Sequence, residues 1–128
     1  MTGPVVVGAR SARPGVLRLA MREALARRTY VRVVHCCPPS ATPTGQATLD
    51  DLRRQAHLDD HLSPPVCFEL SGPRVVDVLE RAARSASALV LGCTDSRWFT
   101  ELRPDDVVAR LARHADSPVT VVPEDCAT

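Results

Sequence analysis

Histidine and cysteine side chains gather where one apolar run of the sequence ends. His35, Cys36 and Cys37 follow one another directly, and Cys93 comes after a later apolar run. Imidazole nitrogen and thiolate sulfur are preferred zinc ligands, and a thiolate can also act as a nucleophile or redox group. No C-x-x-C motif accompanies them. A thiol- or metal-dependent enzyme using Cys36, Cys37 and Cys93 is therefore one hypothesis, and buried, inert cysteines are the interpretation that we favour.

Other common catalytic and phosphate-binding signatures do not occur in the sequence. All sixteen basic residues are arginine, so a P-loop lysine and a Schiff-base lysine are both impossible. No G-x-G-x-x-G follows the first apolar run, and no G-x-S-x-G nucleophile elbow is found. From these patterns we expect neither an enzyme nor a bound cofactor.

Short β-branched runs alternate with helical patterns along the chain. The runs predict strands at Pro4–Gly8, Tyr30–Cys36, Pro65–Leu70, Ala88–Gly92 and Pro118–Pro123. Apolar residues at helical spacing predict helices over 11–28, 48–62, 71–83 and 104–115. A segment with three prolines, residues 38–45, is predicted to be a loop before the second helix.

This alternation predicts an α/β fold. Five strands joined by helical crossovers give a single-domain, open, five-stranded parallel sheet with helices on both faces. Ligands of such sheets bind beyond the carboxyl ends of the strands, where the strand order reverses. Function is therefore expected in the loops 9–14 and 93–103, which follow the first and fourth strands.

Length and composition exclude several classes of protein. The chain has 128 residues, 45% of them hydrophobic and 24% charged, which is typical of one globular domain. A net charge of +1 gives no reason to expect nucleic acid as a partner. No apolar run approaches the roughly 18 residues of a membrane span, and the start lacks the pattern of a signal peptide. We expect a cytoplasmic protein with reduced cysteines.

Three stretches of the sequence resemble the universal stress protein family. They are VVVGARS near the start, AARSASALVLG at residues 82–92, and VARLARHADSPVTVVP before the end. The resemblance covers residues 1–123 and leaves 124–128 as a tail. It implies the adenine nucleotide alpha hydrolase-like fold, with a parallel sheet of order 3-2-1-4-5.

The resemblance also implies a nucleotide pocket, and this sequence departs from its pattern. ATP-binding members carry an Asp after the first strand and G-x2-G-x9-G-S/T after the fourth. Here Gly92 matches the first glycine, whereas the other pattern positions hold different residue types. The pocket positions of this chain, by the resemblance, are Ala9, Arg10, Val34, Gly92, Asp95, Asp105 and Asp106.

The aspartates at these positions predict poor ATP binding. A helix N-terminus attracts phosphate through its free N–H groups and positive dipole end, but Asp105 and Asp106 place carboxylates there. Asp95 adds a charge where glycine would let the backbone approach phosphate. We expect Arg10 to form an ion pair with Asp95 or Asp105 and to close the empty pocket. The alternative is an adenine-nucleotide-binding stress protein whose altered pocket uses Arg10.

The family's strand order separates the cysteines. It places strands two and four on either side of strand one, so Cys36 and Cys93 end about 10 Å apart. Zinc needs its thiolate ligands at about 2.3 Å. This spacing favours structural cysteines over a shared metal or redox site.

The last predicted strand suggests self-association. In the order 3-2-1-4-5 the run Val119, Thr120, Val121 and Val122 forms an open edge without a charge or bulge to blunt it. We expect a homodimer through this strand, as in many members of the family; the alternative is that residues 124–128 cover the edge. The functional hypothesis is a universal stress protein-like regulatory or interaction module with a protein partner, without nucleic acid or membrane.

Overall fold

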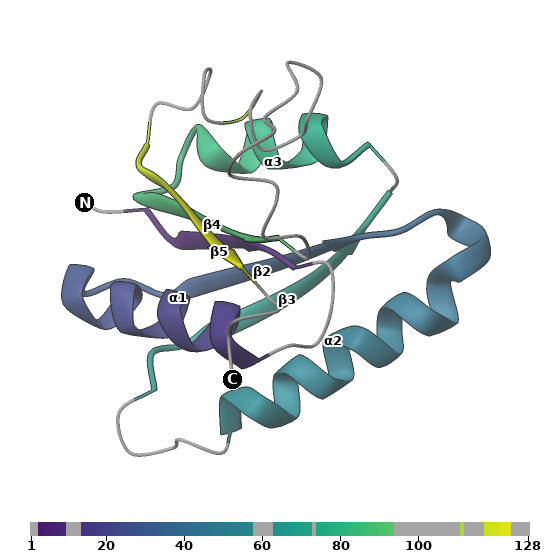
Figure 1. Ribbon diagram of the computed structural model, residues 1–128, viewed down its shortest axis with the longest axis horizontal. Coiled ribbons are helices and arrows are strands. Elements are labelled where there is room, and N and C mark those ends of the chain that lie inside the picture. The colour runs from purple at the N-terminus through teal and green to yellow at the C-terminus, as the bar shows by residue number, and fades with distance from the viewer. Residues whose placement is uncertain are drawn as a thin grey trace.

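Five strands form one parallel sheet in the order β3-β2-β1-β4-β5, which confirms the predicted topology (Figure 1). The computed structural model describes residues 3–9, 14–57, 63–72, 74–93, 111 and 117–123. The strands are β1 Val5–Gly8, β2 Val31–Cys36, β3 Val66–Ser71, β4 Ala88–Cys93 and β5 Val119–Pro123. The helices among the described residues are α1 Pro14–Arg27, a 3-10 turn Pro39–Ala41, α2 Thr42–His57 and α3 Val75–Ala83.

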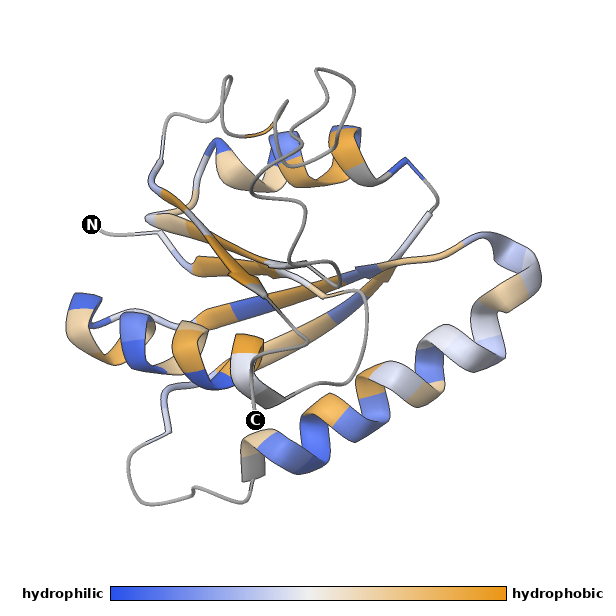
Figure 2. Ribbon diagram, in the orientation of Figure 1, coloured by the Kyte–Doolittle hydropathy of each residue, from blue (hydrophilic) through white to orange (hydrophobic). Residues whose placement is uncertain are grey.

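The central strand β1 is buried completely, as its β-branched sequence predicts. Helices α1 and α2 cover one face of the sheet and α3 lies on the other (Figure 1). Val5, Val7, Val31 and Val33 form a core with α1 and α2. The opposite face packs a second cluster, which consists mainly of Val6, Val34, Leu79, Leu89, Leu91 and Leu111. Figure 2 shows the matching pattern, with apolar strands between helices whose outer sides are polar.

Helix α1 ends where the backbone turns left-handed. Its apolar side, which includes Leu17 and Ala20, is buried against the sheet. Arg28 follows with a φ of 56°, and the N–H of Thr29 donates to the carbonyl of Ala24 at 2.9 Å. This is the bonding of a left-handed helix cap, a position at which glycine is the usual residue.

The second helix begins earlier than the sequence predicts. Residues 38–45 were expected to form a loop, but α2 starts at Thr42 and includes Pro43 and Gly45. Pro43 lies in the first turn, where its missing N–H removes no helical hydrogen bond. Gly45 is a packing residue, since a Cβ there would lie 2.8 Å from the Sγ of Cys37 and 2.8 Å from the Cδ1 of Leu70.

Four strands, β1, β2, β3 and β5, begin one residue later than predicted. Pro65 and Pro118 precede β3 and β5, and each uses its carbonyl to accept the first hydrogen bond of the ladder, from Val31 at 2.9 Å and from Leu89 at 2.8 Å respectively. Proline has no N–H with which to continue the ladder. β4 extends one residue beyond its predicted end, to Cys93.

The predicted fourth helix, 104–115, lies outside the described residues except for Leu111, which is helical and fully buried. None of the helices in the described part of the chain is long and apolar enough to cross a membrane.

Candidate functional site

The carboxyl ends of the three central strands bring several predicted positions together. Gly8 pairs with Val34 on one side and with Leu91 on the other, so β1, β2 and β4 end nearly level. The carboxyl ends of these strands therefore hold Val34 on β2, Gly92 on β4 and Ala9 directly after β1, and all three residues are buried. Arg10, Asp95, Asp105 and Asp106 lie outside the described residues, and with them the expected ion pair of Arg10.

The backbone of Ala9 is bonded to β2 through both of its polar groups. Its N–H donates to the carbonyl of Val34 at 3.0 Å. Its carbonyl oxygen lies 2.8 Å from Nδ1 of His35, which is 9% exposed. Because a carbonyl only accepts, Nδ1 carries a proton and donates it to this hydrogen bond. His35 thus fixes the first loop position to the second strand.

The structure divides the predicted histidine and cysteine cluster between two faces of the sheet. Successive side chains of a strand point to opposite sides. Cys36 packs against the cluster on the α3 side, whereas His35 and Cys37 approach Gly45 of α2. The backbone of Cys93 pairs with Pro123, and its side chain lies outside the described part of the structure. Three or more histidine, cysteine or carboxylate side chains do not converge on one point among the described residues.

Burial raises the pKa of the Cys36 thiol, with a further contribution from the neighbouring Cys37. A raised pKa lowers the fraction of thiolate at neutral pH, and the thiolate is the reactive and metal-binding form. The environment of Cys36 therefore resembles that of a structural cysteine.

Gly8, at the end of β1, allows side chains of β4 and α3 to pack closely against the backbone of β1. A Cβ at Gly8 would lie 2.8 Å from Cδ2 of Leu91 and 2.9 Å from Cδ1 of Leu79. The glycine that ends the first strand is thus explained by the approach of α3 to the sheet.

Comparison with known proteins agrees with the fold. The universal stress protein family matches residues 1–123. The chain belongs to the universal stress protein family. Among curated protein sequences, no relative matches the chain.

Several solved universal stress proteins share the fold at low sequence identity. One, solved in complex with cAMP, is 20% identical, covers 97% of this chain and 99% of its own, and has a TM-score of 0.72. The protein from Archaeoglobus fulgidus is 22% identical over 94% of this chain and 98% of its own, with a TM-score of 0.66. A family member from Burkholderia pseudomallei is 21% identical over 93% and 95%, with a TM-score of 0.67.

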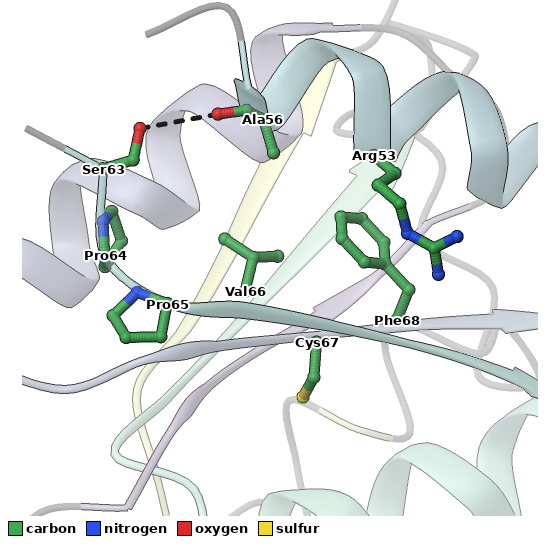
Figure 3. A pocket seen from close by; sticks show the side chains of 8 residues that line it. All are labelled: Arg53, Ala56, Ser63, Pro64, Pro65, Val66, Cys67 and Phe68. Carbon is green, nitrogen blue, oxygen red and sulfur yellow. Dashed lines mark hydrogen bonds between the residues drawn. The ribbon is translucent and has the colours of Figure 1, made fainter. Parts of the chain in front are cut away.

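Sequence reasoning missed a cavity at the other end of the sheet. A hollow of about 600 Å³ lies between α2 and β3, near the start of β3 (Figure 3). Its lining residues are Arg53, Ala56, Ser63, Pro64, Pro65, Val66, Cys67 and Phe68. The guanidinium of Arg53 stands over the ring of Phe68, 5.2 Å from the ring centroid. The sequence signals were an apolar strand with one charge, Glu69, after a Pro-Pro pair, and the order 3-2-1-4-5 that places this strand at an edge. Neither signal reveals how α2 lies over the strand.

Proposed function

We propose that this universal stress protein is a regulatory or interaction module that does not bind ATP in the usual pose of its family. The observation that carries the proposal is the pair Asp105 and Asp106, which stands where the ATP motif has Gly and Ser or Thr. Asp95 stands where the motif has its second glycine. We further propose that the protein acts in a stress-linked process by contacting a protein partner, as a cytoplasmic homodimer without enzymatic activity.

The expected size of the electrostatic repulsion supports the proposal. A like-charge contact at about 4 Å costs on the order of 4 kcal/mol at an effective dielectric constant of 20. That energy corresponds to roughly a thousandfold in affinity. A carboxylate in contact with the phosphates would convert a micromolar ATP site into a millimolar one.

The bonding of Ala9 also supports the proposal. Its N–H is used by Val34, and one lone pair of its carbonyl is used by His35. A nucleotide at the end of β1 would find no free backbone donor at this position, because a backbone N–H makes one good hydrogen bond.

Mass spectrometry of the purified protein after denaturation tests the proposal. We expect less than one adenine nucleotide per chain to be released. Release of one nucleotide for every chain would contradict the proposal and would identify the ligand at the same time.

The second candidate is an adenine-nucleotide-binding protein with an altered pocket. It is favoured by the retained Gly92 and by Arg10, a cation that directly follows the end of β1 and Ala9 in the sequence. A related fold has been solved with cAMP, and cyclic AMP carries one phosphate where ATP carries three. Because repulsion grows with ligand charge, cAMP is the more compatible ligand. Calorimetric titration with cAMP distinguishes the candidates, since heat of binding that is lost in Arg10→Ala would favour the second.

A further inference from the structure

The cavity beside β3 lies along the free edge of the strand. A cavity above one face of a sheet is lined by alternate residues of a strand, because successive side chains point to opposite faces. This cavity is lined by the consecutive residues 63–68, of which Val66, Cys67 and Phe68 are successive residues of β3. In Figure 3, Phe68 and Cys67 point to opposite sides of the strand, and α2 supplies Arg53 and Ala56 from above. The hollow is therefore a groove between the edge of β3 and the overhanging α2.

The hydrogen bonds of β3 show which backbone groups face this groove. The carbonyl of Pro65 accepts from Val31 of β2 at 2.9 Å, and that of Ser71 accepts from Cys37, the residue after β2, at 3.1 Å. In a parallel ladder, alternate residues bond to the same neighbour. Residues 65, 67, 69 and 71 thus face β2, and the N–H and C=O groups of Val66, Phe68 and Leu70 point outward. Within the described part of the chain, β3 ends the sheet on this side.

Among the described residues, α2 overhangs this edge on one side, but the strand itself lacks the sequence devices that usually prevent strand addition. Native edge strands are blunted by lysine, by an internal proline, by a bulge or by an inward charge. Val66–Ser71 contains no lysine and no proline, and it pairs with β2 in an unbroken register. Its one charge, Glu69, is held by Arg32 of β2 through two hydrogen bonds of 2.9 and 2.8 Å. That ion pair stabilises the strand and leaves its outer edge open.

We propose that an extended, acidic segment of another protein adds to the β3 edge as a sixth strand. Backbone bonds to Val66, Phe68 and Leu70 would hold the segment, and its side chains on the α2 side would enter the groove. The groove has room for an aromatic side chain against Val66 and Phe68. Arg53 at its rim is half exposed and has Asp50 as its ion-pair partner at a loose 3.6 Å, which favours a carboxylate on the incoming strand.

A second copy of this chain fits the groove less well. On the side of β3 that faces α2, a second β3 would present only the apolar residues Val66, Phe68 and Leu70, and its acid, Glu69, lies on the other side of the sheet. Such a copy would offer Arg53 no carboxylate. Charge complementarity therefore points to a different chain.

Strand addition at β3 names the kind of protein partner that the proposed function requires. It rests on the proposed function only in assuming that the partner is a protein. The proposed function and the strand addition at β3 can be refuted independently. Release of bound ATP would refute the proposed function and leave the β3 groove unaffected. Absence of strand addition would refute the groove and leave the ATP result unchanged.

Fluorescence anisotropy with a designed peptide tests the proposal. The probe is a labelled ten-residue peptide with the core Glu-Thr-Phe-Thr-Glu, whose symmetry allows either strand direction. We expect binding that weakens about threefold in Arg53→Gln, the size of an exposed ion pair. The matched variant is Arg54→Gln, whose side chain is 72% exposed and pairs with Asp51; it should bind as the wild type does. Replacing both glutamates of the peptide by glutamines should remove the difference between the variants, because a neutral peptide has no charge for Arg53 to attract.

Backbone chemistry locates the bound strand. N-methylation of one alternate set of peptide amides should abolish binding, and N-methylation of the other set should not, because only one edge of an added strand bonds to β3. Amide exchange measured by NMR should show new protection at Val66, Phe68 and Leu70. No binding at millimolar peptide, equal effects of the two methylated sets, or protection elsewhere would overturn the proposal. Protection of these amides that rises with protein concentration alone would also overturn it, in favour of a second copy.

Discussion

For single residues, the alternation of side chains along a strand determines which face of the sheet each reactive side chain reaches. His35, Cys36 and Cys37 are adjacent in sequence, yet the strand directs Cys36 to one side of the sheet and His35 to the other. The imidazole bonds to the backbone of Ala9 at 2.8 Å. The sequence predicted inert cysteines from the missing C-x-x-C motif, and the raised pKa of Cys36 agrees with that interpretation.

The thiol of Cys36 is expected to react slowly. Burial raises its pKa, so at neutral pH its thiolate fraction is lower than in an unfolded chain. Alkylation by iodoacetamide, followed residue by residue with peptide mass mapping, should be slower at Cys36 in the folded protein than in urea. The rate should climb as the pH rises through the alkaline range. Faster alkylation in the folded protein at pH 7 would contradict the structural role.

The raised pKa also makes stability depend on pH in a defined direction. Folding favours the neutral thiol, so the contribution of Cys36 to stability is complete below the ordinary thiol pKa of 9.0 and is lost as the pH rises above it. The free energy of unfolding of the wild type should therefore fall more steeply above pH 9 than that of Cys36→Ala. Parallel pH profiles for the two proteins would show that burial of this thiol does not act as described.

At the scale of elements, the sequence predicted what is local and missed what is tertiary. The strands and their order followed from β-branched runs and from the family resemblance. The start of α2 was wrong, because Pro43 and Gly45 were interpreted as helix breakers. Pro43 is harmless in a first turn, and Gly45 serves the contact with Cys37 and Leu70. The groove at β3 was also missed, because it depends on how α2 packs over an edge strand and no sequence pattern shows that packing.

The cap of α1 offers a stabilising substitution. Arg28 holds a φ of 56°, a conformation that costs residues with a Cβ about 1 kcal/mol or more. Arg28→Gly should raise the free energy of unfolding by about 0.5–1 kcal/mol after the entropy cost of glycine. Urea denaturation measures this change. Arg28→Ala is the control, because it removes the same charge and keeps the Cβ; equal stability of the two variants would mean that the left-handed turn is not the cause.

At the scale of the whole molecule, the sheet has two edges, and they are suited to different contacts. β3 lies under the overhang of α2 and presents a groove (Figure 3). β5 ends the sheet on the other side and bonds to β4 alone among the described strands. The bond from Leu89 to the carbonyl of Pro118 sets its register, so the N–H groups of Val119 and Val121 point outward.

We predict that the protein self-associates through β5. Two copies meeting antiparallel about a twofold axis would satisfy both β5 edges. Val121→Pro removes an outward N–H without touching the ladder to β4, so the chain should stay folded and become monomeric. Val121→Thr, which keeps the N–H, should remain a dimer. Sedimentation at tens of micromolar decides this, and a monomeric wild type, or a dimer that persists in Val121→Pro, would exclude β5 as the interface.

We expect the carboxylates of Asp95, Asp105 and Asp106 to exclude ATP from the family's usual site. Calorimetry with Mg-ATP compares the wild type with the triple variant Asp95→Gly, Asp105→Gly and Asp106→Ser, which restores the motif after Gly92. We expect no heat of binding for the wild type at micromolar protein, and measurable binding for the triple variant once the like charges are removed. A wild-type dissociation constant below about 50 μM, near −6 kcal/mol, would contradict this expectation.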